Sequence, residues 1–309
     1  MEALFILLLA LILDLALGEP PASIHPVVWM GKSISLLTKG KPRHSSGAQF
    51  LYGLIIALIT IAIFAVPVYF VLSYLRELNQ VAFIVAGAVI FKTCFSLKGL
   101  KQAATKINNL LREDKMVGAR FELRALVGRD TSRLDKSQIV SATVESVAEN
   151  SCDSFFAPLF YFVFFGVVGA VVYRVINTLD AMIGHHGEFE YVGKFAARLD
   201  SAANFIPARI TALVIVLATR IRRRNASGAW QIMLRDRRKT ESPNAGWTMS
   251  AMAGALGVQL EKVGYYKLGD NHNSLSSSSI DASLQIVITA AFIWSLLLIA
   301  SEVIINVTT

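Results

Sequence analysis

The stretch LYGLIIALITIAIFAVPVYFVLS, residues 51–73, contains no charged side chain. A bilayer core about 30 Å thick is crossed by a helix of about 20 apolar residues, so this stretch predicts a membrane-spanning helix. Over the whole chain of 309 residues, 54% are hydrophobic and 17% are charged, whereas about 25% are charged in a typical soluble domain. The composition therefore excludes an ordinary soluble protein.

Further apolar runs predict further helices, near residues 3–17, 81–97, 155–173, 206–219 and 283–305. Only the last is comfortably long; the shorter runs favour helices that are tilted, interfacial or surrounded by protein, and 206–219 is the weakest. Glu2 stands where a signal peptide carries positive charge, so we expect the first run to be retained as a membrane helix. The predicted fold class is all-α: a polytopic integral membrane helical bundle with about five or six membrane segments.

The net charge of +8 comes from basic residues that flank the apolar runs and does not indicate nucleic-acid binding. They gather after the first run, at Lys32, Lys39, Lys41 and Arg43, and after the weak run, at Arg220, Arg222, Arg223 and Arg224. By the positive-inside rule, loops 20–50, 98–154 and 220–280 face the cytoplasm. We expect one membrane-embedded catalytic domain, 1–309, in the cell membrane, with cytoplasmic helical segments at about 98–154 and 220–280.

Acidic residues recur every four positions in TVESVAENSCDSFFAPLFY, residues 143–161, at Glu145, Glu149 and Asp153. On a helix they project from one face, where like charges repel one another. A divalent cation would reverse that penalty, and Mg²⁺ favours a few carboxylates together with substrate phosphates. The alternative is a solvated polar face whose carboxylates pair with arginine or lysine.

Arg174, Asn177 and Asp180 interrupt the apolar stretch YRVINTLDAMIGHHG, residues 173–187, at three-residue intervals. Ionisable groups inside membrane segments are costly and mark a functional cavity by default. The alternative is an internal salt bridge that only fixes helix packing. The adjacent His185 and His186 point in different directions on a helix and are weak candidates for a metal pair.

Two further stretches combine arginines with a predicted turn or helix start: ARLDSAANFIPARITA, residues 197–212, and RDRRKTESPNAGWTMSAMAGALG, residues 235–257. Pro207 favours a helix start that places Arg209 in the first turn, where backbone amides suit an anion. The planar guanidinium groups of Arg198 and Arg209 are suited to bind phosphate or carboxylate through paired hydrogen bonds. The alternative is that these arginines only fix the orientation of the chain in the membrane, beside the lipid headgroups. The turn at Asn244 either presents amides to an anion or simply begins a packing helix.

Six strings resemble, in order and along nearly the whole chain, the adenosylcobinamide-phosphate synthase family, also called CobD/CbiB. They are DLALGEPPASIHPV, LVGRDT, ESVAENSCDSFFAPLFY, YRVINTLDAMIGH, ARLDSAANFIPARITA and SPNAGWTMSAMAGALGV. Ser201 stands where a second aspartate is expected after Asp200, and Thr248 where a proline is usual. These departures leave the roles of those two positions open.

The resemblance implies an ATP-dependent amide ligase of cobalamin (vitamin B12) biosynthesis. The free carboxylate of adenosylcobyric acid, a corrinoid, would be joined to an aminoalcohol phosphate, either (R)-1-aminopropan-2-yl phosphate or ethanolamine phosphate. An acyl phosphate route needs Mg²⁺ on the nucleotide and cationic groups for the phosphoryl charge. The site residues implied are Glu145, Glu149 and Asp153, with Asp180 added, for Mg²⁺; Arg129, Arg174, Arg198 and Arg209 for phosphate or carboxylate; Asn150, Asn177, Asn204 and Asn244 for substrate; and Asp180, His25 and Glu149 for catalysis.

The active site is expected to open to the cytoplasm, in a cavity where residues 149–153 meet residues 177–180. The competing class is a transporter or channel with Arg174, Asp180 and Arg198 along its path, although no inverted repeat is visible in the sequence. A sensor or assembly protein that has lost catalysis is a third class, and the retained acidic and arginine residues disfavour it. Self-association and association with other enzymes of the pathway are left open.

Overall fold

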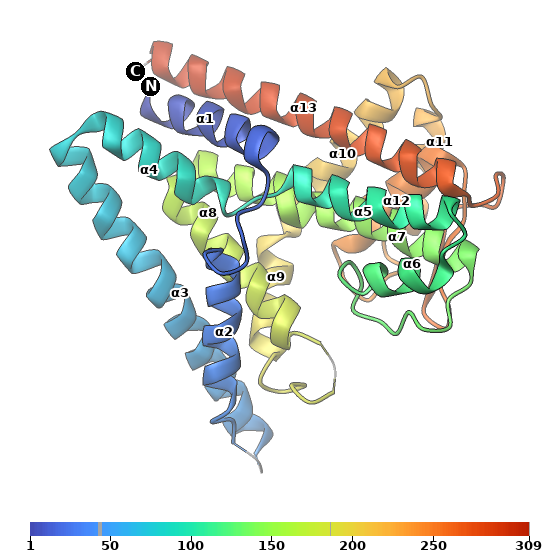
Figure 1. Cartoon of the computed structure of the whole chain (residues 1–309), viewed down its shortest axis with the longest axis horizontal. Coiled ribbons are helices and arrows are strands. Elements are labelled where there is room, and N and C mark those ends of the chain that lie inside the picture. The colour runs from blue at the N-terminus through green and yellow to red at the C-terminus, as the bar shows by residue number, and fades with distance from the viewer. Residues whose placement is uncertain (43–44, 186, 309) are drawn as a thin grey trace. The chain divides into compact units, whose positions relative to one another are not determined.

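The computed structural model describes residues 1–42, 45–185 and 187–308 and divides the chain into two compact units (Figure 1). The first unit comprises Met1–Ser96, Ala157–Ala203 and Leu298–Thr309; the second comprises Leu97–Phe156 and Asn204–Leu297. Both segments predicted to form the cytoplasmic helical portion, 98–154 and 220–280, belong to the second unit. Two residues named above, Arg43 and His186, lie outside the described residues.

The predicted all-α membrane bundle is confirmed. Among the described residues, 4 helices are long and apolar enough to cross a membrane: Ser46–Leu78, Gln80–Arg112, Lys136–Ile183 and Ser277–Ile305. A fifth crossing arises if Lys194–Ala203 and Phe205–Ile221, which meet at a bend of 47°, count as one span. The first apolar run forms a helix, Glu2–Leu17, of 16 residues. At 1.5 Å per residue it is about 24 Å long, shorter than a bilayer core.

The first unit is built on a helical hairpin. It contains α1 (Glu2–Leu17), α2 (Pro26–Thr38), α3 (Ser46–Leu78), α4 (Gln80–Lys92), α8 (Ala157–Ile183) and α9 (Lys194–Ala203). Asn79 ends α3 in an extended conformation, and its side chain accepts a hydrogen bond from the Ala82 amide at 2.9 Å to begin α4. This one-residue connection keeps α3 and α4 in contact (Figure 1). Helices α2, α3 and α9 pack against α8, and α1 packs against α4.

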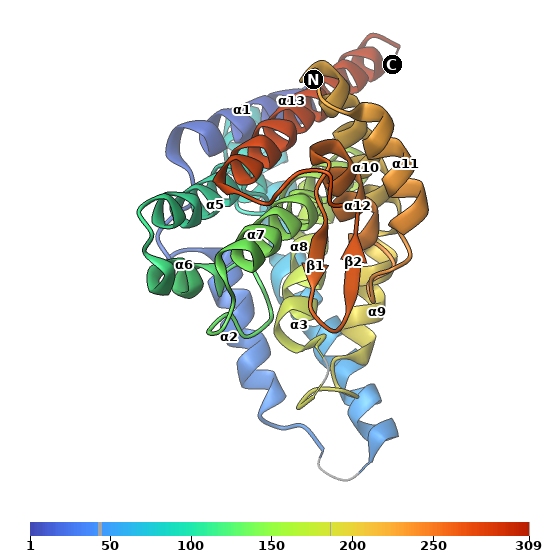
Figure 2. The same ribbon diagram turned by 90° about the vertical axis from the view of Figure 1, so that its right-hand side faces the viewer.

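The second unit surrounds a buried helix, α12. Its elements are α5 (Leu97–Arg112), α6 (Met116–Leu123), α7 (Lys136–Ser151), the π-helix η1 (Cys152–Phe156), α10 (Phe205–Ile221), α11 (Ala226–Asp236), α12 (Ala245–Leu256), β1 (Leu260–Lys262), β2 (Tyr266–Leu268) and the part of α13 (Ser277–Thr308) up to Leu297. α12 contacts α7, α10 and α11. The antiparallel strands β1 and β2 lie beside α7 and α12 (Figure 2).

Small residues let α11 and α12 approach closely. A Cβ atom added to Gly254 would lie 2.3 Å from the Gly228 carbonyl oxygen, and one added to Gly228 would lie 3.0 Å from the Gly254 oxygen. Backbones at this separation leave no room for larger side chains, as in membrane helix pairs generally. The close packing predicted for the alanine- and glycine-rich stretch is therefore confirmed.

A similar close contact joins α3 to the segment before α9 and yields a first prediction. A Cβ atom on Gly53 would lie 1.9 Å from the Val192 carbonyl oxygen, so Gly53→Ala should force the backbones apart and cost about 1–3 kcal/mol. Thermal unfolding in one detergent measures the loss. Gly47→Ala in the same helix is the matched control, because its Cβ would meet nothing closer than 4.0 Å. Equal unfolding temperatures for the two variants would contradict the predicted contact.

Candidate functional site

The acidic stretch predicted to bind metal runs from α7 into the π-helix. α7 begins with a capping box between Asp135 and Gln138. All residues from Ile139 to Ala148 are buried, so this part of α7 passes through the interior of the second unit. At Cys152 the chain changes to the wider π-helical turn. The four-residue repeat that would align Asp153 with Glu149 is broken at that point.

Glu145 forms an internal ion pair with Arg129. Only 6% of the Glu145 side chain is exposed. Its Oε1 accepts from the Ser141 hydroxyl at 2.7 Å, and its Oε2 accepts from Arg129 Nη2 at 3.3 Å and from the Tyr266 hydroxyl at 2.9 Å. Burial and the negative charge of Glu145 raise the pKa of Tyr266, so the phenol stays a hydrogen-bond donor. The group ties α7 to β2 and to the loop that carries Arg129.

This geometry does not fit Glu145 as a ligand of Mg²⁺. A guanidinium and two hydroxyl groups already satisfy the carboxylate of Glu145. The alternative stated for the acidic stretch, a carboxylate that pairs with an arginine, therefore describes Glu145. Within the described residues, no group of three or more His, Cys, Asp or Glu side chains is placed to hold a metal ion. The expected preformed triplet of Glu145, Glu149 and Asp153 is therefore not present. Coordination of Mg²⁺ by Glu149 or Asp153 together with substrate phosphates stays a prediction.

Arg209 lies near the start of α10 and contacts Asn244, which precedes α12. Because α10 begins at Phe205 and not at Pro207, Arg209 follows the first turn of the helix in which it was predicted. Its Cζ atom is 3.5 Å from the Phe205 ring centroid and 4.8 Å from that of Trp247, and its Nη1 donates to Asn244 Oδ1 at 3.2 Å. Arg237 lies over the same Trp247 ring, with its Cζ at 4.9 Å from the centroid. Two residues predicted from the sequence are thus joined by two that were not, Trp247 and Arg237.

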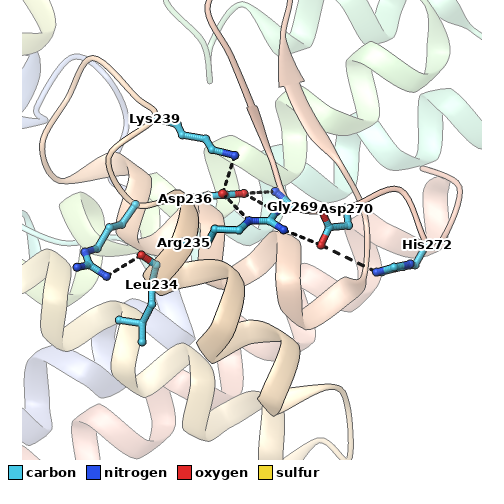
Figure 3. A network of polar contacts seen from close by, with 8 residues as sticks. Leu234, Arg235, Asp236, Lys239, Gly269, Asp270 and His272 are labelled. Carbon is cyan, nitrogen blue, oxygen red and sulfur yellow. Dashed lines mark hydrogen bonds and ion pairs between the residues drawn. The ribbon is translucent and has the colours of Figure 1, made fainter.

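A buried carboxylate, Asp236, holds the turn that carries Arg237 (Figure 3). Its side chain is 0% exposed and accepts from Arg235 Nε and Nη2 at 2.8 and 2.9 Å, from Lys239 Nζ at 2.6 Å and from the Gly269 amide at 2.8 Å. Arg235 also contacts Asp270 at 3.0 Å. Burial raises the pKa of Asp236, but these donors outweigh it and lower the pKa to about 2. The end of α11 is thereby fixed to the residue that follows β2.

Two predicted asparagines lie near the π-helix. Asn204 precedes α10, is 3% exposed, and its Oδ1 accepts a weak hydrogen bond from the Cys152 thiol at 3.9 Å. Asn150 is half-buried near the end of α7. Both therefore belong to the second unit, as do Arg209 and Asn244. Their binding of substrate stays a prediction.

In the first unit, the polar face predicted on α8 is linked to α9. Arg174 Nη1 donates to Asn177 Oδ1 at 3.4 Å, and Asn177 Nδ2 donates to Asp200 Oδ1 at 3.5 Å. The Nε atom of Arg174 is buried and has no hydrogen-bond partner in the part of the chain that the structure describes. Asp180 is half-buried two turns after Arg174 and Arg198 is exposed on α9. The predicted cavity shared by residues 149–153 and 177–180 involves both units and stays a prediction.

His25 acts as the cap of α2. Its Nδ1 accepts from the Val27 amide at 3.2 Å, and its Nε2 lies 2.5 Å from Glu19 Oε2. Lys92 joins the group, at 3.0 Å from Glu19 and 3.2 Å from Asp14. Burial raises the pKa of Glu19, but its hydrogen bonds outweigh this and lower the pKa to about 2. With both ring nitrogens engaged, His25 is poorly placed to act as the general base.

Several residues of these groups were not predicted from the sequence, among them Trp247, Arg237 and Tyr266. Trp247 stands directly after the turn at Asn244, and an aromatic ring among arginines is a signal for cation–π contact. Arg237 is one of several basic residues in RDRRK, and no local feature separates it from Arg238. Tyr266 is 121 positions from Glu145 in the chain. No local pattern connects residues at that separation.

The fold and these groups define a polytopic helical membrane protein with buried arginine, carboxylate and amide groups. The family model for CobD/CbiB proteins matches residues 7–293. The chain is 50% identical over 297 residues to the cobalamin biosynthesis protein CobD of Dehalococcoides mccartyi, covering 96% of each. It is 42% identical over 282 residues to a probable CobD of Methanothermobacter thermautotrophicus, covering 91% of each. The chain belongs to the CobD/CbiB family of cobalamin biosynthesis proteins. No solved structure matches it.

The partners of Glu145 predict the behaviour of Glu145→Gln. Arg129 would be left buried without its counter-charge, which should lower the free energy of unfolding by about 3 kcal/mol. Binding of Mn²⁺ to the protein without substrate, followed by electron paramagnetic resonance, should equal that of the wild type. Glu261→Gln, at a surface ion pair with Lys267, is the control and should change neither quantity. A stable Glu145→Gln variant that loses a Mn²⁺ site would restore Glu145 as a metal ligand.

Asp236 predicts a pH dependence of stability. Its pKa of about 2 in the folded chain lies below the usual 3.8, so its stabilising effect is complete above about pH 4 and is lost as pH falls toward 2. Asp236→Asn should lower the free energy of unfolding at pH 7 by about 2 kcal/mol, and its difference from the wild type should shrink on acidification. Thermal unfolding between pH 7 and pH 3 measures this. The more exposed Asp270→Asn should cost less, and a pH-independent loss in Asp236→Asn would exclude the charge as its cause.

Proposed function

We propose that this chain is an adenosylcobinamide-phosphate synthase. It would join the free carboxylate of adenosylcobyric acid to the amine of (R)-1-aminopropan-2-yl phosphate, or of ethanolamine phosphate, using ATP. Membership of the CobD/CbiB family supports a role in cobalamin biosynthesis. The structural observation that carries the proposal is the pairing of Arg209 and Arg237 on Trp247, because a ligase of this kind must handle phosphorylated substrates.

The reaction proceeds in two steps. A carboxylate oxygen attacks the γ-phosphorus of ATP and ADP leaves, which gives an acyl phosphate. The amine nitrogen then attacks the acyl carbon, phosphate leaves, and the proton of the former ammonium group passes to a base. Negative charge shifts among phosphoryl oxygens throughout, and guanidinium groups held in fixed positions stabilise it. Mg²⁺ enters as part of the Mg-ATP substrate.

The residues of the two units divide into candidates for different roles. Arg209 and Asn244 suit an anionic and hydrogen-bonding part of a substrate, since their polar groups lie together. The group of Arg174 and Asn177 suits carboxylate or amide groups, because the buried Nε of Arg174 has no partner among the described residues. Asp180 is the better candidate for the base than His25, whose ring nitrogens are both engaged. Arg129 is committed to Glu145 and supports the fold.

Product formation by the purified, detergent-solubilised chain tests this function. The complete mixture of adenosylcobyric acid, aminopropanol phosphate and Mg-ATP should yield a corrinoid that carries the new amide, with ADP and phosphate in equal amounts. Omission of any one component should abolish the product. A folded sample that makes no product with either aminoalcohol phosphate, and that shows ATP-independent solute flux in liposomes, would instead support the transporter class.

A further inference from the structure

Two arginines share one indole ring in the second unit without a counter-charge. Arg209 and Arg237 both lie over Trp247, at 4.8 and 4.9 Å from Cζ to the ring centroid. Their hydrogen bonds go to neutral oxygens: the Phe205 carbonyl and Asn244 Oδ1 for Arg209, and the Leu234 carbonyl at 2.7 Å for Arg237. Within the described residues neither forms an ion pair. We call Arg209, Trp247 and Arg237 the arginine–indole site.

Two other arginines of the same unit that lie beside its buried carboxylates are neutralised. Arg235 is paired with Asp236 and Asp270, and Arg129 is paired with Glu145. The arginine–indole site differs because ring faces and carbonyl oxygens orient its guanidinium groups but leave their charge in place. Two like charges brought to one ring repel each other. An incoming anion would relieve that repulsion.

The position of Arg237 is fixed before any ligand arrives. The adjacent Asp236 is buried and is tied to Arg235, Lys239 and the Gly269 amide (Figure 3). On the other side, the first turn of α12 comes so close that a Cβ on Gly246 would lie 2.3 Å from the Arg237 carbonyl oxygen. Such fixed geometry lowers the entropic cost of binding.

We propose that the arginine–indole site binds the phosphate of a small phosphomonoester. Two guanidinium groups match the double negative charge of its dianion, whereas a single carboxylate would neutralise only one of them. Identification of the ester as the aminoalcohol phosphate rests on the proposed function, but the site itself does not. The terminal phosphate of ATP and the headgroup of phosphatidic acid share this chemistry.

Direct binding to the full chain in phosphate-free detergent buffer tests the site. Isothermal titration with ethanolamine phosphate, with a non-hydrolysable ATP analogue, and with phosphatidic acid in nanodiscs distinguishes the three sources. Arg237→Gln should weaken binding of the true ligand at least about tenfold, because it removes one charge-assisted contact. Arg238→Gln is the matched control: its side chain is exposed, and binding should change less than about twofold, because solvent and salt screen an exposed charge that does not contact the ligand.

Tryptophan fluorescence supplies a readout that loss of packing alone would not reproduce. Ligand should change the emission of the wild type and of Trp230→Phe, whose indole is exposed, but not that of Trp247→Phe. Should Arg237→Gln fail to fold, Arg237→Lys, which retains the charge but loses the planar fork, carries the same comparison with Arg238→Lys.

Different outcomes separate this proposal from the proposed function. No binding of any of the three compounds to the folded wild type, or equal losses in Arg237→Gln and Arg238→Gln, would overturn the arginine–indole site. Binding that depends on Arg237, in a protein that forms no amide product, would retain the site and reject the ligase function. Amide formation at the wild-type rate and KM in Arg237→Gln would retain the function and exclude the aminoalcohol phosphate and ATP as ligands of the site, which would then stand only if phosphatidic acid binds it in an Arg237-dependent way.

Discussion

Charges removed from water must be satisfied within the protein, and this constraint organises both units. A buried ion costs several kcal/mol unless an opposite charge and hydrogen bonds compensate it. Glu145 is compensated by Arg129, Asp236 by Arg235 and Lys239, and Lys92 by Asp14 and Glu19. Each of these pairs joins elements that are distant in sequence or fixes a helix end. The charges therefore determine where the helices meet, while apolar burial supplies most of the stabilisation.

Charged groups that escape this compensation mark where a ligand is expected. Arg209 and Arg237 are oriented by aromatic rings and neutral oxygens, and the Nε of Arg174 is buried without a partner among the described residues. An uncompensated cation that the fold holds in place lowers stability, so it is a candidate for a binding site. The contrast between Arg237, fixed beside the buried Asp236, and the exposed Arg238 is informative because the two are neighbours with the same chemistry.

The apolar runs were sufficient to predict the helical membrane fold, because a helix is the only way for a single segment to satisfy its backbone within lipid. The sequence also predicted the shared polar face of Arg174 and Asn177 and the turn at Asn244, but not the contact between Arg209 and Asn244. The predicted metal triplet is not preformed among the described residues, for two reasons that no local pattern reveals. A π-helical turn breaks the four-residue repeat before Asp153, and Tyr266, 121 positions away, shares Glu145 with Arg129. Likewise, nothing near His25 indicated that Glu19 and Val27 would engage both ring nitrogens.

The engagement of Glu145 has a consequence for how the protein handles phosphate. The carboxylate of Glu145 pairs with Nη2 of Arg129 and accepts from two hydroxyl groups, so the pair contributes to the fold of the second unit. Arg209 and Arg237 need no metal to orient them, because Phe205, Trp247 and the turn at Asp236 already do so. At the proposed arginine–indole site, recognition of the phosphate would therefore not require Mg²⁺, which a nucleotide carries on its own oxygens. The proposed site would bind a metal-free phosphomonoester as well as it does in the presence of the ion.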